Sequence, residues 1–169
     1  MALKTYSPQD ILVSIAGLHT VQGYADGTFV RIYRESAPFG MRRAMDGSVE
    51  RLFNKDEGYK VDLTLAQSSE TNNILSAIHN VDIATKAGKY PLLIRDMRGQ
   101  TSFFAGTAWI EDIPEVVFSN GMETRTWTFA CTQAGLLIGG NGDVAAIEST
   151  LLAATSFLPV LTDFGIFGR

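Results

Sequence analysis

The sequence is poor in the residue types that build metal centres and disulfide frameworks. It has one cysteine, Cys131, and two histidines, His19 and His79. A single cysteine forms no disulfide within its chain, which suits a reducing compartment. The cysteine and histidines match no zinc-binding spacing. We therefore predict no metal site and no cofactor, with Cys131 as a core thiol and His79 on the flank of a helix.

Long apolar runs and a strongly basic balance are also missing. The longest apolar run, LLAATSFLPVL, is too short to cross a bilayer and contains Pro159. The N-terminal stretch MALKTYSPQDI lacks the apolar region of a secretory signal. The formal net charge is −4, which is not the footprint of a nucleic-acid-binding protein. These features predict a soluble, non-secreted protein with no membrane partner.

What the sequence does contain is apolar–polar alternation with a period of two. In YKVDLTLA, Val61, Leu63 and Leu65 alternate with Asp62 and Thr64. Further strand candidates are DILVSIAGL, TVQGY, TFVRIYR, YPLLIRD, TSFFAGTAWI and the two sides of the Asn-Gly turn in VVFSNGMETRTWTFAC. Such alternation is typical of half-buried antiparallel strands. Because repeated strand–helix alternation is absent, we predict a mainly β fold, a sandwich or barrel of about seven antiparallel strands with one flanking helix.

The helix is expected in SSETNNILSAIHNVDIATKAG, at about residues 69–86. Ser68 or Ser69 would cap its start, and Leu75 and Val81 are among the apolar residues at helical spacing.

The domain organisation is expected to change near the C-terminus. We predict a β domain over 1–134 and a C-terminal extension over 135–169. The extension begins with a glycine-rich stretch, and its segment DVAAIESTLLAA predicts a second helix at about 143–155.

One cluster of carboxylates offers a catalytic hypothesis. Glu111, Asp112 and Glu115 surround Pro114. Paired carboxylates can hydrolyse glycosidic bonds or bind a hard cation. A solvated loop between two strands explains them more simply. No motif of the chain favours catalysis, so we predict that the protein is not an enzyme.

A more unusual segment joins two strand candidates at about residues 37–57. Eleven of the chain's 32 charged side chains lie between Arg34 and Lys60, and both signs alternate with apolar residues. Structureless connections of this length are uncommon unless they have a function. The segment could form a hairpin of its own around Asp46-Gly47. Its mixed surface suits a protein contact in which charge selects the partner.

Several stretches together resemble a family of known proteins. They are MALKTYSPQDILVSIAG, GYADGTFVRI, MDGSVERLFN, VDLTLAQSSETNNILSAIH and AWIEDIPEVVFSNGMETRTW. In this order and spacing, across roughly residues 1–131, the chain resembles the tail tube proteins of contractile-tailed bacteriophages related to certain Pseudomonas myoviruses. The C-terminal extension is longer than that family leads us to expect.

The resemblance implies a fold of two packed antiparallel sheets with a flanking helix, as in phage tail tubes and type VI secretion tubes. It implies hexameric rings that stack into a hollow tube in the virion, after assembly in the host cytoplasm. The expected partners are the sheath protein, baseplate and tail terminator proteins, with the tape measure protein and genomic DNA as transient contents of the lumen.

The resemblance also suggests roles for particular residues. The 37–57 loop would contact a neighbouring subunit or ring. Its proposed contact residues are Phe39, Met41, Arg42, Arg43, Met45, Asp46, Glu50, Arg51, Phe53 and Lys55. Candidates for the lumen-facing surface are Asp62, Thr64, Thr124, Thr126 and Thr128. For these five, an exposed sheet face on a monomer is the alternative.

Two further functions stay open at this point. One is a related structural part on the same fold, such as a tail terminator, a baseplate-proximal tube protein or a secretion-type tube subunit. The other is a carbohydrate-binding or glycosidase-like β-barrel that uses Glu111, Asp112 or Glu115.

Overall fold

The computed structural model describes residues 6–140. The regular elements of this part of the chain are η1 (Pro8–Asp10), β1 (Ile11–Ile15), β2 (His19–Thr20), β3 (Val30–Arg34), β4 (Phe39–Arg43), β5 (Val49–Phe53), β6 (Tyr59–Ala66), α1 (Thr71–Thr85), β7 (Tyr90–Asp96), β8 (Ser102–Asp112) and β9 (Thr124–Leu137). The prediction of a mainly β fold with a flanking helix is confirmed.

Seven of the strands form a single hydrogen-bonded sheet in the order β2-β1-β7-β8-β9-β6-β3. Every neighbouring pair in it is antiparallel. The remaining strands, β4 and β5, pair only with each other. The expected pair of packed sheets is therefore one continuous sheet that folds over itself, with a separate hairpin.

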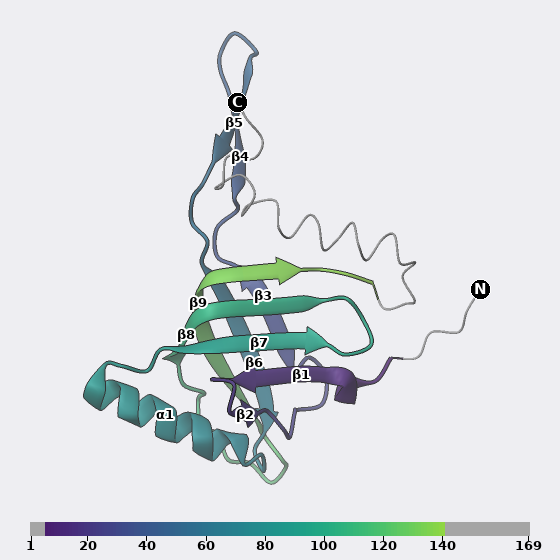
Figure 1. Ribbon diagram of the computed structural model, residues 1–169, viewed down its shortest axis with the longest axis vertical. Coiled ribbons are helices and arrows are strands. Elements are labelled where there is room, and N and C mark those ends of the chain that lie inside the picture. Colours follow the sequence, from purple (N-terminus) through teal and green to yellow (C-terminus); the bar gives the residue numbers. More distant parts are fainter. Residues whose placement is uncertain (1–5, 141–169) are drawn as a thin grey trace, which may run out of the picture.

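The long strand β9 makes this folding-over possible. Its first part, from Thr124 to Cys131, pairs with β6, and its second part, from Thr128 to Leu137, pairs with β8. Register shifts in β8 and β7 mark bulges, which bend and twist strands. In Figure 1, β1, β7 and β8 consequently cross in front of β3, β6 and the start of β9.

The core lies between the two halves of the folded sheet. Alternate residues of the strands point into it, as the period of two predicted, and Val61, Leu63 and Leu65 are at most 1% exposed. Phe103 of β8 and Phe129 of β9 are fully buried. Each such side chain contributes about 1.5–3 kcal/mol through removal of apolar surface from water. This continuous cluster stabilises the body, which we define as residues 6–34 and 59–140.

The helix α1 packs on the sheet through its first turns alone. Thr71, Asn72 and Leu75 are buried, whereas Val81 and Ile83 in the second half of the helix are 60% and 65% exposed. Asn72 ties the helix down, because its side-chain amide donates to the carbonyl of Ala66 and accepts from the Trp127 indole.

Several local predictions need correction. The apolar face expected for the helix is buried only in part, since Val81 points into solvent. The helix begins at Thr71 with Glu70 in the cap position, although the Ser69 hydroxyl accepts from the Thr71 amide at 3.3 Å. The expected strand VVFS is wrong, because residues 113–123 form no regular strand.

The last described strand passes through the region of the predicted domain boundary. Strand β9 continues to Leu137, past the domain boundary predicted at 134. The helix predicted at about 143–155, with most of the extension over 135–169, lies outside the described residues.

The hairpin of β4 and β5 projects from the body along the long axis of the molecule (Figure 1). We call residues 39–53 the arm. The helix α1 and the irregular segment 113–123 lie at the opposite end of the body (Figure 1).

Candidate functional site

Two of the three carboxylates considered for catalysis make separate structural contacts. Glu111 accepts an ion pair from Lys60 at 2.9 Å, and Asp112 accepts from the backbone amide of Ile113 at 2.9 Å. Glu115 is exposed. Among the described residues, no cluster of three or more histidine, cysteine or acidic side chains is placed to hold a metal ion. The most distinctive surfaces of the molecule lie elsewhere.

The arm is the first of these surfaces. All ten residues of its two strands are exposed. The strands pair in the order Phe39 with Phe53, Met41 with Arg51, and Arg43 with Val49. Paired residues share one face of an antiparallel ribbon, so these six side chains form one face, which we call the apolar face of the arm.

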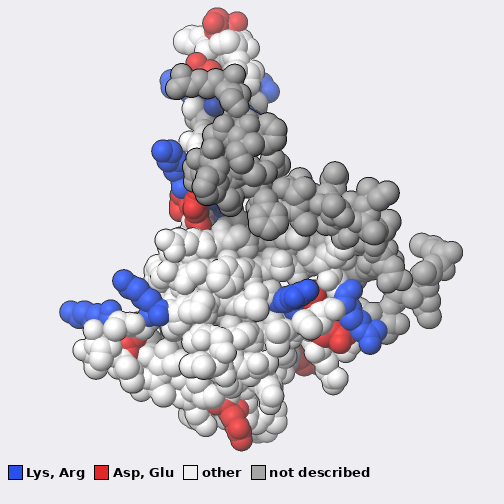
Figure 2. Space-filling model, in the orientation of Figure 1, with Lys and Arg blue, Asp and Glu red and all other residues white. Residues whose placement is uncertain are grey.

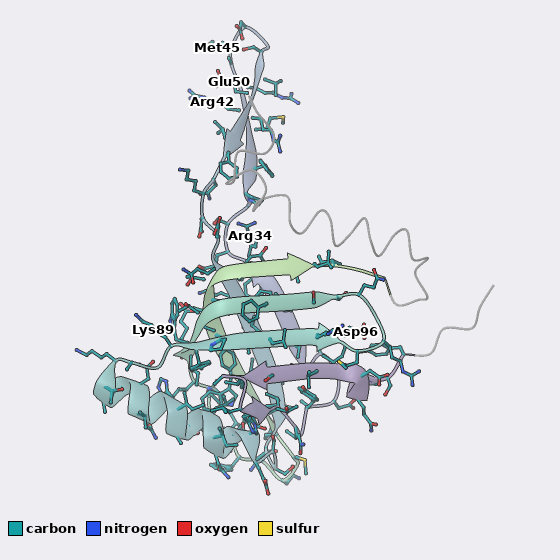
Figure 3. The ribbon with its side chains drawn as sticks, viewed as in Figure 1. Arg34, Arg42, Met45, Glu50, Lys89 and Asp96 are labelled. Carbon is teal, nitrogen blue, oxygen red and sulfur yellow. The ribbon has the colours of Figure 1, made fainter. Side chains whose placement is uncertain are left out.

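The apolar face is ordered by contacts between its own side chains. The rings of Phe39 and Phe53 lie 5.5 Å apart, and the Arg51 guanidinium lies 3.8 Å above the Phe39 ring. The opposite face carries Gly40, Leu52, Arg42 and Glu50. Figure 3 shows Arg42, Met45 and Glu50 along the arm, far from the body. Figure 2 shows that the arm carries charges of both signs.

The tip of the arm is a tight turn at Asp46-Gly47, which confirms the hairpin predicted there. Gly47 has a φ of 87°, a conformation that side chains disfavour. The Asp46 carboxylate accepts from both the amide and the hydroxyl of Ser48, and these hydrogen bonds lower its pKa. Met45 beside the turn is fully exposed.

Residues 35–38 and 54–58, which we call the neck, join the arm to the body through polar contacts. Asp56 accepts from the Ser36 hydroxyl and from the Gly58 amide, and its pKa is lowered, chiefly by the Ser36 hydrogen bond. Arg34 at the end of β3 donates to the backbone carbonyl of Asp56. The arm is thus held as an extension of the β3–β6 pair. Lys55, one of the predicted contact residues, lies in this neck.

A polar strip on the outer face of β6 and β9 is the second surface. Asp62 pairs with Thr128, and Thr64 pairs with Thr126, across the two strands. The hydroxyls of Thr64 and Thr126 lie 3.1 Å apart, and Thr128 donates to Asp62 at 3.0 Å. Thr124 follows on the same face by register. The structure therefore brings the five predicted lumen candidates together on one face.

The polar strip borders an ion cluster that the sequence did not reveal. The Lys60 ammonium lies 2.7 Å from Glu35 and 2.9 Å from Glu111. The hydrogen bond to Glu35, followed by that to Glu111, raises the pKa of Lys60 above its usual range. Glu35 and Glu111 are far apart in sequence and meet only because β9 places β8 near β6.

The third surface is the segment 113–123, which sequence reasoning took for a strand. Phe118 and Met122 are 75% and 73% exposed, and Ile113, Val116 and Val117 are about half exposed. A groove of about 410 Å³ separates the segment from α1, and Asn73, His79 and Pro114 are among its lining residues. Its run of apolar residues without alternation is the signal that could have identified it.

The sheet itself has two open edges within the described residues. One edge is β3, and the other is the short strand β2 beside β1. Open edges present unpaired backbone groups that can add further strands. None of the helices in residues 6–140 is both long and apolar enough to span a membrane.

Comparison with known proteins finds a relative in sequence. The chain is 31% identical to "Structural protein ORF10" of Pseudomonas phage KPP10 over 158 residues, which cover 89% of this chain and 91% of that protein. No protein-family model matches the chain.

Two solved structures share the fold. The anti-feeding prophage cap, described as the AFP tube terminating cap, superposes with a TM-score of 0.53 at 12% identity, over 81% of this chain and 94% of the cap chain. A chain from the virion of the native gene transfer agent particle gives a TM-score of 0.52 at 12% identity, over 79% and 100%.

Proposed function

The chain belongs to the family of phage structural proteins that includes Structural protein ORF10 of Pseudomonas phage KPP10, and we propose that it is a subunit of the phage tail tube. In this proposal the protein has a structural rather than a catalytic role. Hexameric rings of the chain stack into a hollow conduit inside a contractile sheath, and DNA leaves the virion through it.

The observation that carries the proposal is the exposed arm. An isolated two-stranded hairpin is marginally stable in water. Within residues 6–140, no other element covers the apolar face of the arm, and Met41, Val49 and Phe53 are 58–65% exposed. An exposed apolar patch on a soluble protein commonly marks an interaction site. In a stacked tube the arm would reach a neighbouring copy, which would bury this face.

The open sheet edges support ring formation. A head-to-tail interface that closes by rotation gives a ring, and a second interface along the axis gives a filament. Pairing of β3 with the β1–β2 edge of the adjacent copy would remove both edges at once. In that arrangement the paired sheet edges would close each ring, and the arms would join one ring to the next.

The polar strip supports a lumen-facing role for Asp62, Thr64, Thr124, Thr126 and Thr128. The five residues of this strip include no lysine or arginine, the nearby Lys60 forms ion pairs with two glutamates, and the one basic neighbour across the register is Arg31, opposite Asp62. A conduit for DNA gains from a surface that releases phosphates, because basic side chains would hold them. The tape measure protein would occupy the same lumen before DNA, and the sheath, baseplate and terminator proteins would contact the tube from outside and at its ends.

A tail terminator is the second candidate, because the chain shares its fold with a tube terminating cap. A terminator would form one closed ring that does not stack. The chemistry of the subunit would be the same, and the number of copies would differ.

Negative-stain electron microscopy of the purified full chain separates these functions. A tail tube subunit is expected to form rings that stack into tubes of uniform diameter. Single rings that never stack would favour the terminator. A chain that remains monomeric at high concentration would contradict both proposals.

A further inference from the structure

The arm and the segment 113–123 lie at opposite ends of the molecule (Figure 1). If copies are stacked along the long axis, the arm of one copy meets the far end of the next. Such an interface is head-to-tail, and it repeats without closing on itself.

Both surfaces expose apolar side chains in the described part of the chain. On the arm these are Phe39, Met41, Val49 and Phe53, each at least half exposed. On the segment the most exposed are Phe118 and Met122. Apolar faces of this kind are stabilised when they leave water together.

The charges of the two surfaces are opposite. The apolar face of the arm carries Arg43 and Arg51 and no acidic side chain. Residues 112–123 carry Asp112, Glu115 and Glu123. The groove adds Glu70 and Arg125, whose guanidinium lies 5.8 Å from the Phe118 ring, so this surface is acidic in balance. Complementary charges of this kind select a partner and set its register. They also disfavour contact between two arms or between two copies of the segment.

The groove beside the segment gives this second surface a concave site that can receive side chains. It runs between α1 and residues 113–116, and its volume is about 410 Å³. A mixed groove of this size can accept a few side chains rather than a whole strand. The arm offers such side chains in exposed methionines, which adapt to irregular surfaces.

From these three observations we propose that the apolar face of the arm docks on the segment 113–123, the adjoining Asp112 and the groove in a second copy of the chain. The occupant is thus the arm of an identical subunit, and the opposite face, with Arg42 and Glu50, remains outside the contact. The inference rests on the proposed tube function and specifies which surfaces of the neighbouring copies meet.

Cross-linking between two separately tagged variants of the full chain tests this proposal. One variant carries Met41→Cys and the other carries Val117→Cys, so every cross-link between them joins two copies. A short bis-maleimide reagent is added after the variants are mixed. The native thiol does not interfere, because Cys131 is 1% exposed. The matched control replaces Met41→Cys by Arg42→Cys, one residue away on the opposite face of the arm.

The expected result is a cross-linked pair of copies with Met41→Cys and its loss with Arg42→Cys, in samples that electron microscopy shows to be assembled. Assemblies without the Met41–Val117 cross-link would overturn the docking proposal while leaving the tube function in place. Equal cross-linking by both arm positions would overturn it as well. Failure of the wild-type chain to assemble would remove the tube function, and this inference with it.

Discussion

The body and the arm of this protein are both built from antiparallel strands but differ in the burial of their side chains. In the body, strands β1, β6, β7, β8 and β9 place buried residues between half-buried or exposed ones around one core. In the arm, both strands are exposed on both faces. The body therefore holds the core of the described chain, and the arm holds side chains that no other element of residues 6–140 buries. The difference can be tested by matched changes in the two regions.

The largest difference is expected for loss of one aromatic side chain in each region. Phe103→Ala should destabilise the fold by about 3–5 kcal/mol, because the side chain is fully buried. Phe53→Ala should change the stability by no more than ~0.5 kcal/mol, because the ring is 65% exposed. Urea unfolding of unassembled protein measures both. Equal losses would place the arm within the monomer's cooperative fold.

A smaller loss is expected at the contact between helix and sheet. Asn72→Ala removes the acceptor of the Trp127 indole and leaves that buried donor without its protein partner, which costs about 1–3 kcal/mol. The neighbouring Asn73→Ala is the control, since Asn73 is exposed on the same helix. Thermal unfolding should separate the two variants. Similar melting temperatures would show that α1 contributes little to the body.

The core should also respond to alkaline pH. Burial raises the pKa of Cys131 to about 12, from about 9. Between these values the unfolded thiol ionises while the folded thiol keeps its proton, so stability is full below pH 9 and falls as pH rises. From pH 8 to pH 10 the loss due to Cys131 is about 1–2 kcal/mol.

Urea unfolding of the wild-type chain and of Cys131→Ala at the two pH values tests this expectation. The variant should retain a weaker pH dependence, because burial also raises the pKa of Tyr24 to about 12. Identical pH dependence in both proteins would show that Cys131 is not shielded.

The smallest effect on folding, with a selective effect on assembly, is expected for charge reversals in the arm. Arg43→Glu and Arg42→Glu should leave the melting temperature nearly unchanged, because exposed charges contribute little to stability. Arg43 shares the apolar face and Arg42 does not. Sedimentation should therefore show weaker stacking for Arg43→Glu than for Arg42→Glu. A large drop in melting temperature would instead indicate a packed role within the subunit.

The sequence predicted the body well because alternation with a period of two reports directly on a half-buried strand. It also predicted the hairpin turn at Asp46-Gly47, which depends on local backbone preferences. It did not predict the fold-over of the single sheet, because the bend depends on how one long strand pairs with two different neighbours. The Lys60 cluster was missed for the same reason, since its partners come from distant strands.

The segment 113–123 shows a different limit of sequence reasoning. Its apolar residues and Asn-Gly turn resemble a strand and hairpin in local composition, yet its side chains find no place in the core. Among the predicted contact residues, the sequence identified the region of the arm but not its two faces. Those faces follow from the pairing register, which places Arg43 with the aromatic rings and Arg42 opposite them.

The central claim is that the arm serves assembly and the body serves folding. Deletion of residues 40–54 tests it most directly, because the two sides of the hairpin meet at its base, where the Asn54 amide donates to the Pro38 carbonyl at 2.8 Å, so the shortened chain can join Phe39 to Lys55 there. Electron microscopy of the deletion variant, beside the wild-type chain, is the measurement. We expect a folded subunit that forms no stacked tubes. Normal tubes formed by the deletion variant would contradict the claim.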